Sequence, residues 1–216
     1  MRRAALALLL AAAALASGCD LDGNAGPTRS ESRDVATFDR IQLHGRTSLT
    51  VRTGAPPTLS LRGGERVLDS LETTVRDGTL VFDPQDEGLN DDHDVDVTIT
   101  VPRLRAVEAD GAGSIRLVNI DTDALELRNN GASDFTASGR VGTLSAIVGG
   151  AGELDLGDLE ARDATVRIEG VGDAEVTVWG ELDAIITGVG DIEYRGNPTV
   201  RSDDEGVGEV RPAGFG

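Results

Sequence analysis

The stretches "GVGDAEV" at residues 170–176 and "GVGDIEY" at residues 188–194 begin with the same four residues, 18 positions apart. Such a pair is typical of a repeating fold, a phosphate-binding loop or a calcium-binding repeat. The wider sequence favours the repeating fold. Six glycines at intervals of 20, 19, 20, 18 and 18 residues open similar segments: Gly111, Gly131, Gly150, Gly170, Gly188 and Gly206.

Apolar and polar residues alternate on both sides of these six glycines. The positions two, four and six before each glycine are mostly apolar: Val107, Ala109, Leu125, Leu127, Leu144, Ala146, Val148, Ala164, Val166, Ile168, Leu182, Ala184, Ile186 and Val200. The positions four and six after it are apolar too, as in Leu154 and Leu156. Because successive side chains of a strand point to opposite faces, each repeat reads as strand, glycine corner, strand.

A unit of about 19 residues with two short strands cannot bury its apolar face alone, so the repeats must stack. The sequence therefore predicts an all-β fold, a parallel β-solenoid (β-helix) with 18–20 residues per coil and an apolar ladder inside. We expect the six glycines to turn the backbone with positive φ. The phosphate loop is excluded because no helix follows these glycines. The calcium-binding nonapeptide repeat is excluded because the glycine pairs recur at twice its spacing.

The part before the repeats also alternates from Val35 onward, which predicts additional strands. Asp77-Gly78 predicts a two-residue hairpin turn, since both residues tolerate positive φ. Only the stretch "GGERVLDSLE" at residues 63–72 has room for a helical turn. The loop at residues 83–94 carries six acids in twelve residues and predicts a solvated excursion.

Within this loop and just beyond it, three aspartates alternate as in a calcium loop: Asp92, Asp94 and Asp96. An EF-hand would need glycine at Val97 and glutamate at Arg103. The alternation is therefore interpreted as one face of a strand.

The N-terminus has the pattern of a secretory signal. Arg2 and Arg3 precede a 12-residue apolar stretch, and small residues lead to Cys19, the single cysteine of the chain. The run "LASGC" resembles the lipobox of bacterial lipoproteins, which implies acylation of Cys19 and anchoring to a membrane. We expect residues 1–18 to be a signal peptide, residues 19–34 a flexible tether and residues 35–216 a single domain.

The charge and the composition exclude several functions. The net charge is −18, and loss of two arginines with the signal peptide leaves −20. Such a surface repels nucleic acid and anionic lipid. The chain contains no lysine, which excludes a Walker-type phosphate loop and a Schiff base.

The chain resembles the GIN-domain family, the head domains of autotransporter adhesins. The resemblance rests on "FDRIQLHGRTSLTVRTG", "DGTLVF", "VDVTITVPRLRAVEADGAGSIRL", "GVGDAEV" and "GVGDIEYRGNPTV". It implies a right-handed parallel β-helix, often on a bacterial lipoprotein, without established enzymatic activity. Ser133 departs from the pattern because it replaces the second glycine of its repeat, so this corner is expected to be built differently.

These features predict a non-catalytic, lipid-anchored lipoprotein of the bacterial cell envelope that binds an envelope polymer or a protein partner. One alternative is a β-helix enzyme that cleaves polysaccharides, and another is a passive scaffold for a membrane protein. The net charge disfavours a polyanionic substrate, and His44 and His93 lie in unrelated contexts. Six aromatic residues are too few for a sugar-stacking groove, and Trp179 is interpreted as a corner or core cap.

The residues three positions after the corner glycines are Ser114, Asp134, Glu153, Asp173, Asp191 and Glu209, so five of the six are acidic and a column of acids is predicted. Stacked carboxylates repel one another and need compensation. They either accept hydrogen bonds from backbone N–H groups of the corners or hold a calcium ion. The metal candidates are therefore Glu153, Asp173, Asp191 and Glu209, and no other cofactor is expected.

Overall fold

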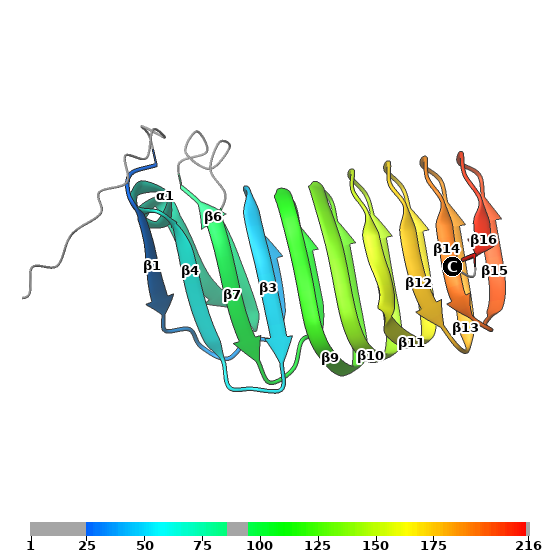
Figure 1. The fold of residues 1–216 in the computed structure, drawn as a ribbon, viewed down its shortest axis with the longest axis horizontal. Helices are drawn as coiled ribbons and strands as arrows, with labels where there is room; N and C mark the ends of the chain where they lie inside the picture. The colour runs from blue at the N-terminus through cyan, green and yellow to red at the C-terminus, as the bar shows by residue number, and fades with distance from the viewer. Residues whose placement is uncertain (1–24, 86–94, 215–216) are drawn as a thin grey trace, which may run out of the picture.

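The protein is a β-solenoid of about five turns. The computed structural model describes residues 25–85 and 95–214, so the predicted signal peptide, Cys19 and most of the acidic loop lie outside the described residues. Figure 1 shows the strands stacked side by side along the long axis, with the N-terminal strands at one end and the C-terminal strands at the other.

The described part contains sixteen strands and one short helix. The N-terminal elements are β1 (Thr28–Arg33), β2 (Arg40–Leu43), β3 (Thr47–Thr53), β4 (Thr58–Gly64), α1 (Glu65–Ser70), β5 (Leu71–Arg76), β6 (Thr79–Pro84), β7 (Val95–Val101) and β8 (Ala106–Ala109). The repeats supply β9 (Ala112–Asn129), β10 (Ala132–Val148), β11 (Leu154–Ile168), β12 (Ala174–Val178), β13 (Glu181–Ile186), β14 (Ile192–Gly196), β15 (Thr199–Asp204) and β16 (Val210–Pro212).

Two walls of strands enclose the core. One wall has the order β1-β4-β7-β3-β9-β10-β11-β12-β14-β16, and the other runs from β5 through β6, β2 and β8 to the second halves of β9–β11, then β13 and β15. The strands β9, β10 and β11 bend from one wall into the other. All neighbours from β3 and β2 toward the C-terminus pair in parallel, which is the topology that the stacked repeats predict.

The strand register reproduces the repeat lengths of the sequence. Ile115 pairs with Phe135, which pairs with Leu154, and the ladder continues to Ala174 and Ile192. These steps are 20, 19, 20 and 18 residues long, as the glycine spacing predicts. A coil therefore corresponds to one repeat, with equivalent residues stacked directly above one another.

The inward and outward faces are those that the alternation predicts. All the inward positions before the glycines are buried except Val200 in the last coil, which is half-buried. Asn129 is a polar residue at an inward position and is fully buried. Its Nδ2 donates to the carbonyl oxygens of Ser133 and Ala151, at 2.6 and 2.9 Å. This amide holds the corner where Ser133 replaces glycine, so that corner is indeed built differently.

The six corner glycines are needed for a different reason than expected. None of them has positive φ, and the positive values fall mostly two residues later: Gly113, Gly152, Gly172, Gly190 and Gly208. At each of the six, a Cβ atom would collide with a backbone carbonyl oxygen of the preceding coil. The expectation of positive φ was therefore wrong, and close stacking of the corners explains the repeat of glycine. Gly45 occupies the same place one coil earlier.

The N-terminal end of the solenoid is closed by antiparallel pairing. β1 pairs with β4, which pairs with β7, while β5 and β6 form a hairpin. The hairpin turn at Asp77 and Gly78 has φ of 49° and 76°, as predicted. α1 forms where a helical turn was expected.

The prediction that residues 19–34 form a flexible tether is wrong for β1, Thr28–Arg33. β4 would otherwise be the edge of its sheet, and an unpaired edge favours pairing with another strand. β1 covers it, and Arg33 donates from Nη1 to the Leu71 carbonyl at 2.6 Å and from Nη2 to the Leu68 carbonyl at 2.8 Å. The polar sequence of β1 gave no alternation because its contacts are made by the backbone and by an arginine.

Candidate functional site

The acidic column lies on the outer surface beside the corners. Asp134 Oδ1 accepts a hydrogen bond from the N–H of Glu153 at 3.0 Å, and Asp173 Oδ1 accepts one from the N–H of Asp191 at 2.8 Å. Asp191 Oδ1 accepts the N–H of Glu209 at 2.9 Å. Each aspartate thus caps the corner of the next coil, which is the first of the two roles predicted for the column.

Arg211 offsets the negative charge of the acidic column at its C-terminal end. Arg211 Nη1 lies 2.7 Å from Asp191 Oδ2, and its Nη2 lies 2.6 Å from Glu193 Oε1. The guanidinium, helped by the Glu209 N–H, holds the pKa of Asp191 below its usual value, and the two carboxylates raise the pKa of Arg211. Within residues 25–85 and 95–214, no group of three or more His, Cys, Asp or Glu side chains is arranged to hold a metal ion.

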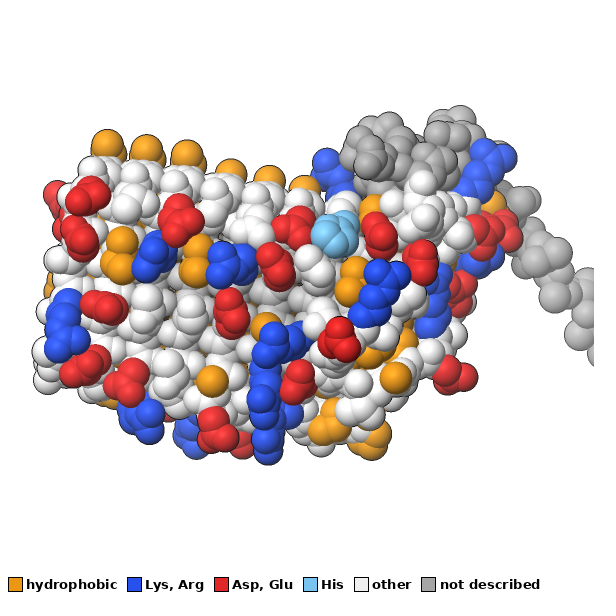
Figure 2. All heavy atoms as spheres, turned by 180° about the vertical axis from the view of Figure 1, so that it is seen from behind, with side chains coloured by type: hydrophobic (Ala, Val, Ile, Leu, Met, Phe, Trp, Pro, Cys, Tyr) orange, Lys and Arg blue, Asp and Glu red, His pale blue; other side chains and the backbone are white. Residues whose placement is uncertain are grey.

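A narrow apolar ridge runs along the corners beside the acidic column. It consists of the residues that follow the corner glycines: Ala112, Ala132, Ala151, Val171, Val189 and Val207. The three valines are 58%, 47% and 68% exposed. Figure 2 shows this ridge as a row of orange side chains along the upper edge. The ridge is only one residue wide because each of its residues lies between two glycines, or between Gly131 and Ser133 in the case of Ala132.

The sequence also drew attention to three single residues: His44, Trp179 and His93. His44 Nδ1 lies 3.4 Å from Asp110 Oδ2 at the first corner. Trp179 lies in the turn between β12 and β13 and is 59% exposed, so it is a corner residue and not a core cap. His93 lies outside the described residues.

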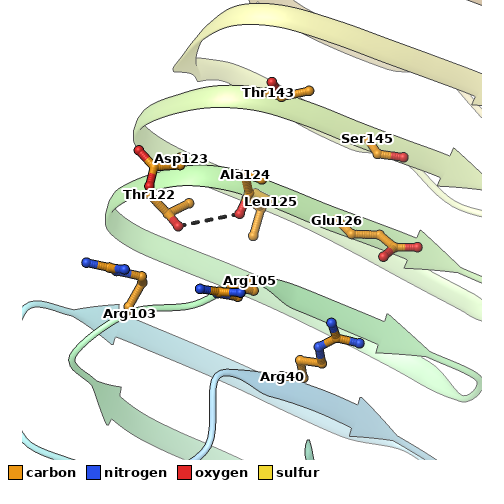
Figure 3. Close-up of a pocket in the computed structure, with 10 residues that line it drawn as sticks. All are labelled: Arg40, Arg103, Arg105, Thr122, Asp123, Ala124, Leu125, Glu126, Thr143 and Ser145. Atoms are coloured by element: carbon orange, nitrogen blue, oxygen red, sulfur yellow. Dashed lines mark hydrogen bonds between the residues drawn. The ribbon is translucent and has the colours of Figure 1, made fainter. Parts of the chain in front are cut away.

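A pocket lined by three arginines opens on the wall formed by β2, β8, β9 and β10. Its volume is about 420 Å³. The lining residues are Arg40, Arg103, Arg105, Thr122, Asp123, Ala124, Leu125, Glu126, Thr143 and Ser145. Figure 3 shows Arg103 and Arg105 on the segment before β8, Arg40 on the neighbouring β2, and the hydroxyl and acidic side chains on β9 and β10.

Local structure directs these arginines outward. Leu104 is fully buried, and because side chains alternate along an extended segment, Arg103 and Arg105 on either side of it are exposed. Arg40 is likewise exposed because the next residue, Ile41, points into the core. Parallel pairing of β2 with β8 then brings Arg40 beside the segment that carries the other two.

The three guanidinium groups differ in their partners. Arg105 Nε lies 3.2 Å from Asp39 Oδ2, and the backbone N–H of Arg105 donates to the Asp39 carbonyl at 2.7 Å. Within the part of the chain that the structure describes, the side chains of Arg40 and Arg103 make no hydrogen bond or ion pair. The pocket therefore contains one arginine fixed by a carboxylate and two that are available to a ligand.

A second hollow of about 390 Å³ adjoins the pocket. Both share Arg103, Thr122 and Asp123, and the second adds Arg140 from β10. Arg140 Nε lies 3.3 Å from Glu160 Oε2 on the next coil. Together the two hollows, which we call the arginine groove, extend across neighbouring coils of the solenoid. In Figure 2, arginines gather among acidic side chains at the lower edge of the face it shows.

The arginine groove could not be predicted from the sequence. Its arginines are separated by 63 and 35 residues along the chain, at positions 40, 103, 105 and 140, and only the stacking of coils brings them together. The one local signal was the alternation in "RLR" at residues 103–105, which places two arginines on the same outer face.

The family model described as "Putative auto-transporter adhesin, head GIN domain" matches residues 37–198. The chain belongs to this family. The resemblance seen in the sequence is therefore confirmed, and the arginine groove and the corner glycines from Gly111 to Gly188 lie within the matched GIN domain.

Solved structures of bacterial proteins share the fold of this GIN domain. A "putative adhesin" from Bacteroides fragilis is 21% identical, with a TM-score of 0.70 over 87% of this chain and 97% of its own. A "putative lipid binding protein" from Parabacteroides distasonis is 21% identical, with a TM-score of 0.50 over 88% and 98%. A "putative adhesin" from Parabacteroides merdae is 16% identical, with a TM-score of 0.53 over 88% and 97%. No curated protein matches the sequence.

Proposed function

We propose that this protein is a non-catalytic lipoprotein of the bacterial cell envelope that acts as a binding module in adhesion. It holds an envelope polymer or a protein partner in the arginine groove. The observation that carries this proposal is the groove itself, which offers two arginines without partners among the described residues. Membership of the GIN-domain family supports an adhesive role.

The rigidity of the solenoid suits such a role. One continuous core extends from Ala25 to Ile192. The residues of the groove are held on stacked strands or, for Arg103 and Arg105, on the four-residue segment that joins β7 to β8. A site on a regular scaffold loses little conformational freedom when a ligand binds. The coils also allow a groove to continue from one repeat to the next, which suits an extended partner.

The alternative of a polysaccharide-cleaving enzyme is less well supported. Asp123 and Glu126 are the carboxylates of the pocket, and both are exposed to solvent. A glycosidase needs one carboxyl group that burial or a close second carboxylate keeps protonated. Glu126 instead lies 3.4 Å from the guanidinium of Arg128. Asp123 and Glu126 are therefore better placed to accept hydrogen bonds from a bound ligand.

Anchoring through Cys19 forms part of the proposal. Among residues 25–85 and 95–214, no helix has the length and apolar character of a membrane span. Acyl chains on Cys19 would then attach the protein to the membrane. Replacing Cys19 by serine is expected to move the protein from the membrane fraction to the soluble fraction of cells. Unchanged membrane association of the variant would contradict lipid anchoring.

Binding can be tested with the full-length protein in vesicles of neutral lipid. These vesicles are expected to sediment with purified envelope polysaccharide, whereas vesicles without protein remain in solution. The matched control is the same protein after heat unfolding, which should behave as empty vesicles do. If the folded protein retains no more vesicles on the polymer than the unfolded protein does, the proposed binding function is wrong.

A further inference from the structure

We propose that the arginine groove recognises an isolated oxyanion, a carboxylate or a phosphate ester, on an otherwise neutral sugar chain. The inference rests on the proposed binding function and specifies the chemistry of its ligand. Guanidinium groups bind carboxylates and phosphates through two parallel hydrogen bonds, which is stronger and more directional than the contact of a single charge.

The two arginines without partners define the position of the oxyanion. Arg40 and Arg103 both line the pocket and approach it from different elements, β2 and the segment before β8 (Figure 3). Arg105 lies in the same pocket, but Asp39 already neutralises it and fixes its Nε. Figure 3 shows Arg105 between Arg40 and Arg103, so an oxyanion with several acceptor oxygens would lie beside Arg105 and take hydrogen bonds from the exposed guanidinium groups on either side.

The other polar groups of the pocket match a neutral sugar. Thr122, Thr143 and Ser145 supply hydroxyl groups that both donate and accept, and the hydroxyl of Thr122 reaches the Ala124 carbonyl only at 3.4 Å. Asp123 and Glu126 accept hydrogen bonds from sugar hydroxyls. A bare phosphate ion has no hydroxyl groups of a sugar to donate to these acceptors, so it would leave them without a partner.

The second hollow gives the sugar chain room to continue. It shares Arg103 with the pocket, and its other arginine, Arg140, is paired with Glu160 on the neighbouring coil. Beyond Arg103, the groove therefore has no further arginine without a partner among the described residues that line it. Neighbouring sugars with hydroxyl groups fit this extension better than neighbouring sugars with charges.

The acidic surface of the protein rejects densely charged polymers. The residues after the predicted signal peptide carry a net charge of −20. At physiological salt the Debye length is about 8 Å, so distant acids are screened from a ligand group in the pocket. A polyanion would lie along many of those acids at close range. Repulsion of the wrong ligand is a common source of specificity. Here it favours a sugar chain with one anionic group over a chain with many.

The test measures binding of defined oligosaccharides to the full-length protein by calorimetry. The probes are a neutral oligosaccharide, the same chain ending in one glucuronate, and the same chain ending in one phosphate ester. The comparison probes are polygalacturonate, inorganic phosphate and vesicles of anionic phospholipid. One of the two singly charged chains is expected to bind at least about 30-fold more tightly than the neutral chain, and more tightly than every comparison probe.

The variant for the groove combines Arg40→Gln with Arg103→Gln, and it should lose the preference for the charged chain. The control combines Arg167→Gln with Arg201→Gln, which removes the same charge from the same wall and should keep that preference. Arg167 and Arg201 are paired with glutamates at 3.6 and 3.5 Å, away from the groove. Melting curves of both variants establish that each is folded.

Several results would overturn the inference. These are equal affinity for charged and neutral chains, tighter binding of polygalacturonate or vesicles, and equal losses in the groove variant and the control. If the groove variant also retains vesicles on envelope polysaccharide as the wild type does, this inference fails and the polymer is not held through Arg40 and Arg103, while binding by the protein itself stands. If the wild type itself retains none, the proposed function fails.

Discussion

Close stacking of the corner glycines can be tested at Gly150. In Gly150→Ala the new Cβ atom would lie 2.6 Å from the Asn130 carbonyl oxygen and closer still to that of Gly131, below the 3.0 Å that real Cβ atoms respect. The obstructing atoms belong to the backbone, so the two coils must separate. Separation weakens the hydrogen bonds from the N–H groups of Gly150 and Ala151 to the previous coil, now 3.0 and 2.7 Å long.

The loss of stability in Gly150→Ala can be calculated from two contributions, the weakened hydrogen bonds and the extra volume. Each weakened hydrogen bond contributes about 1 kcal/mol, and forcing extra volume into a packed site costs about 1–3 kcal/mol. The free energy of unfolding should therefore fall by about 3–5 kcal/mol. In a protein of this length, each kcal/mol corresponds to roughly 2–4 °C, so the melting temperature should fall by roughly 6–20 °C.

The adjacent Gly149 provides a matched control. A Cβ atom there would meet only the Asn130 side chain at 3.4 Å and the Asn129 carbonyl oxygen at 3.6 Å, which are tolerable contacts. Gly149→Ala should change the free energy of unfolding by less than about 1 kcal/mol. Denaturant and thermal unfolding followed by circular dichroism measure both variants. If the two variants unfold with the same free energy, close stacking does not explain the repeated glycines.

Three further predictions concern the faces of the coils and the acidic column. Ile168→Asp should lower the free energy of unfolding by several kcal/mol because Ile168 is fully buried. Arg167→Asp on the outer face should lower it by less than about 1 kcal/mol. Equal losses of the two variants in denaturant unfolding would contradict the strand register. Asp173→Ala should cost about 1 kcal/mol while Asp173→Asn keeps the accepting oxygen. Melting curves with calcium and with chelator should coincide, and a rise with calcium would instead support an ion in the column. Because the pKa of Asp191 is lowered in the folded state, its contribution to stability is present above about pH 4 and is lost as the pH falls further. Arg211→Gln should make acid unfolding less steep, and an unchanged pH dependence would show that the ion pair is not formed in solution.

Much of the fold could be predicted because the same pattern of apolar and polar residues recurs in every coil of the solenoid. The alternation around Val166 and Ile168 is repeated in each coil, so the face of one residue is supported by equivalent residues above and below it. The hairpin at Asp77 was predictable because its turn depends on two adjacent residues. β1 could not be predicted in this way. Its pairing with β4 depends on an uncovered sheet edge, which exists only after the rest of the solenoid has formed.

The sequence by itself determined the period, the inward faces and the capping acids, because each depends on spacing within one repeat. Only the tertiary structure decided why the corner glycines are needed, since the atom that excludes a Cβ at Gly150 belongs to the preceding coil. It also decided the candidate site. Arg40 and Arg103 line one pocket only because parallel pairing of β2 with β8 stacks distant segments at the spacing of adjacent strands.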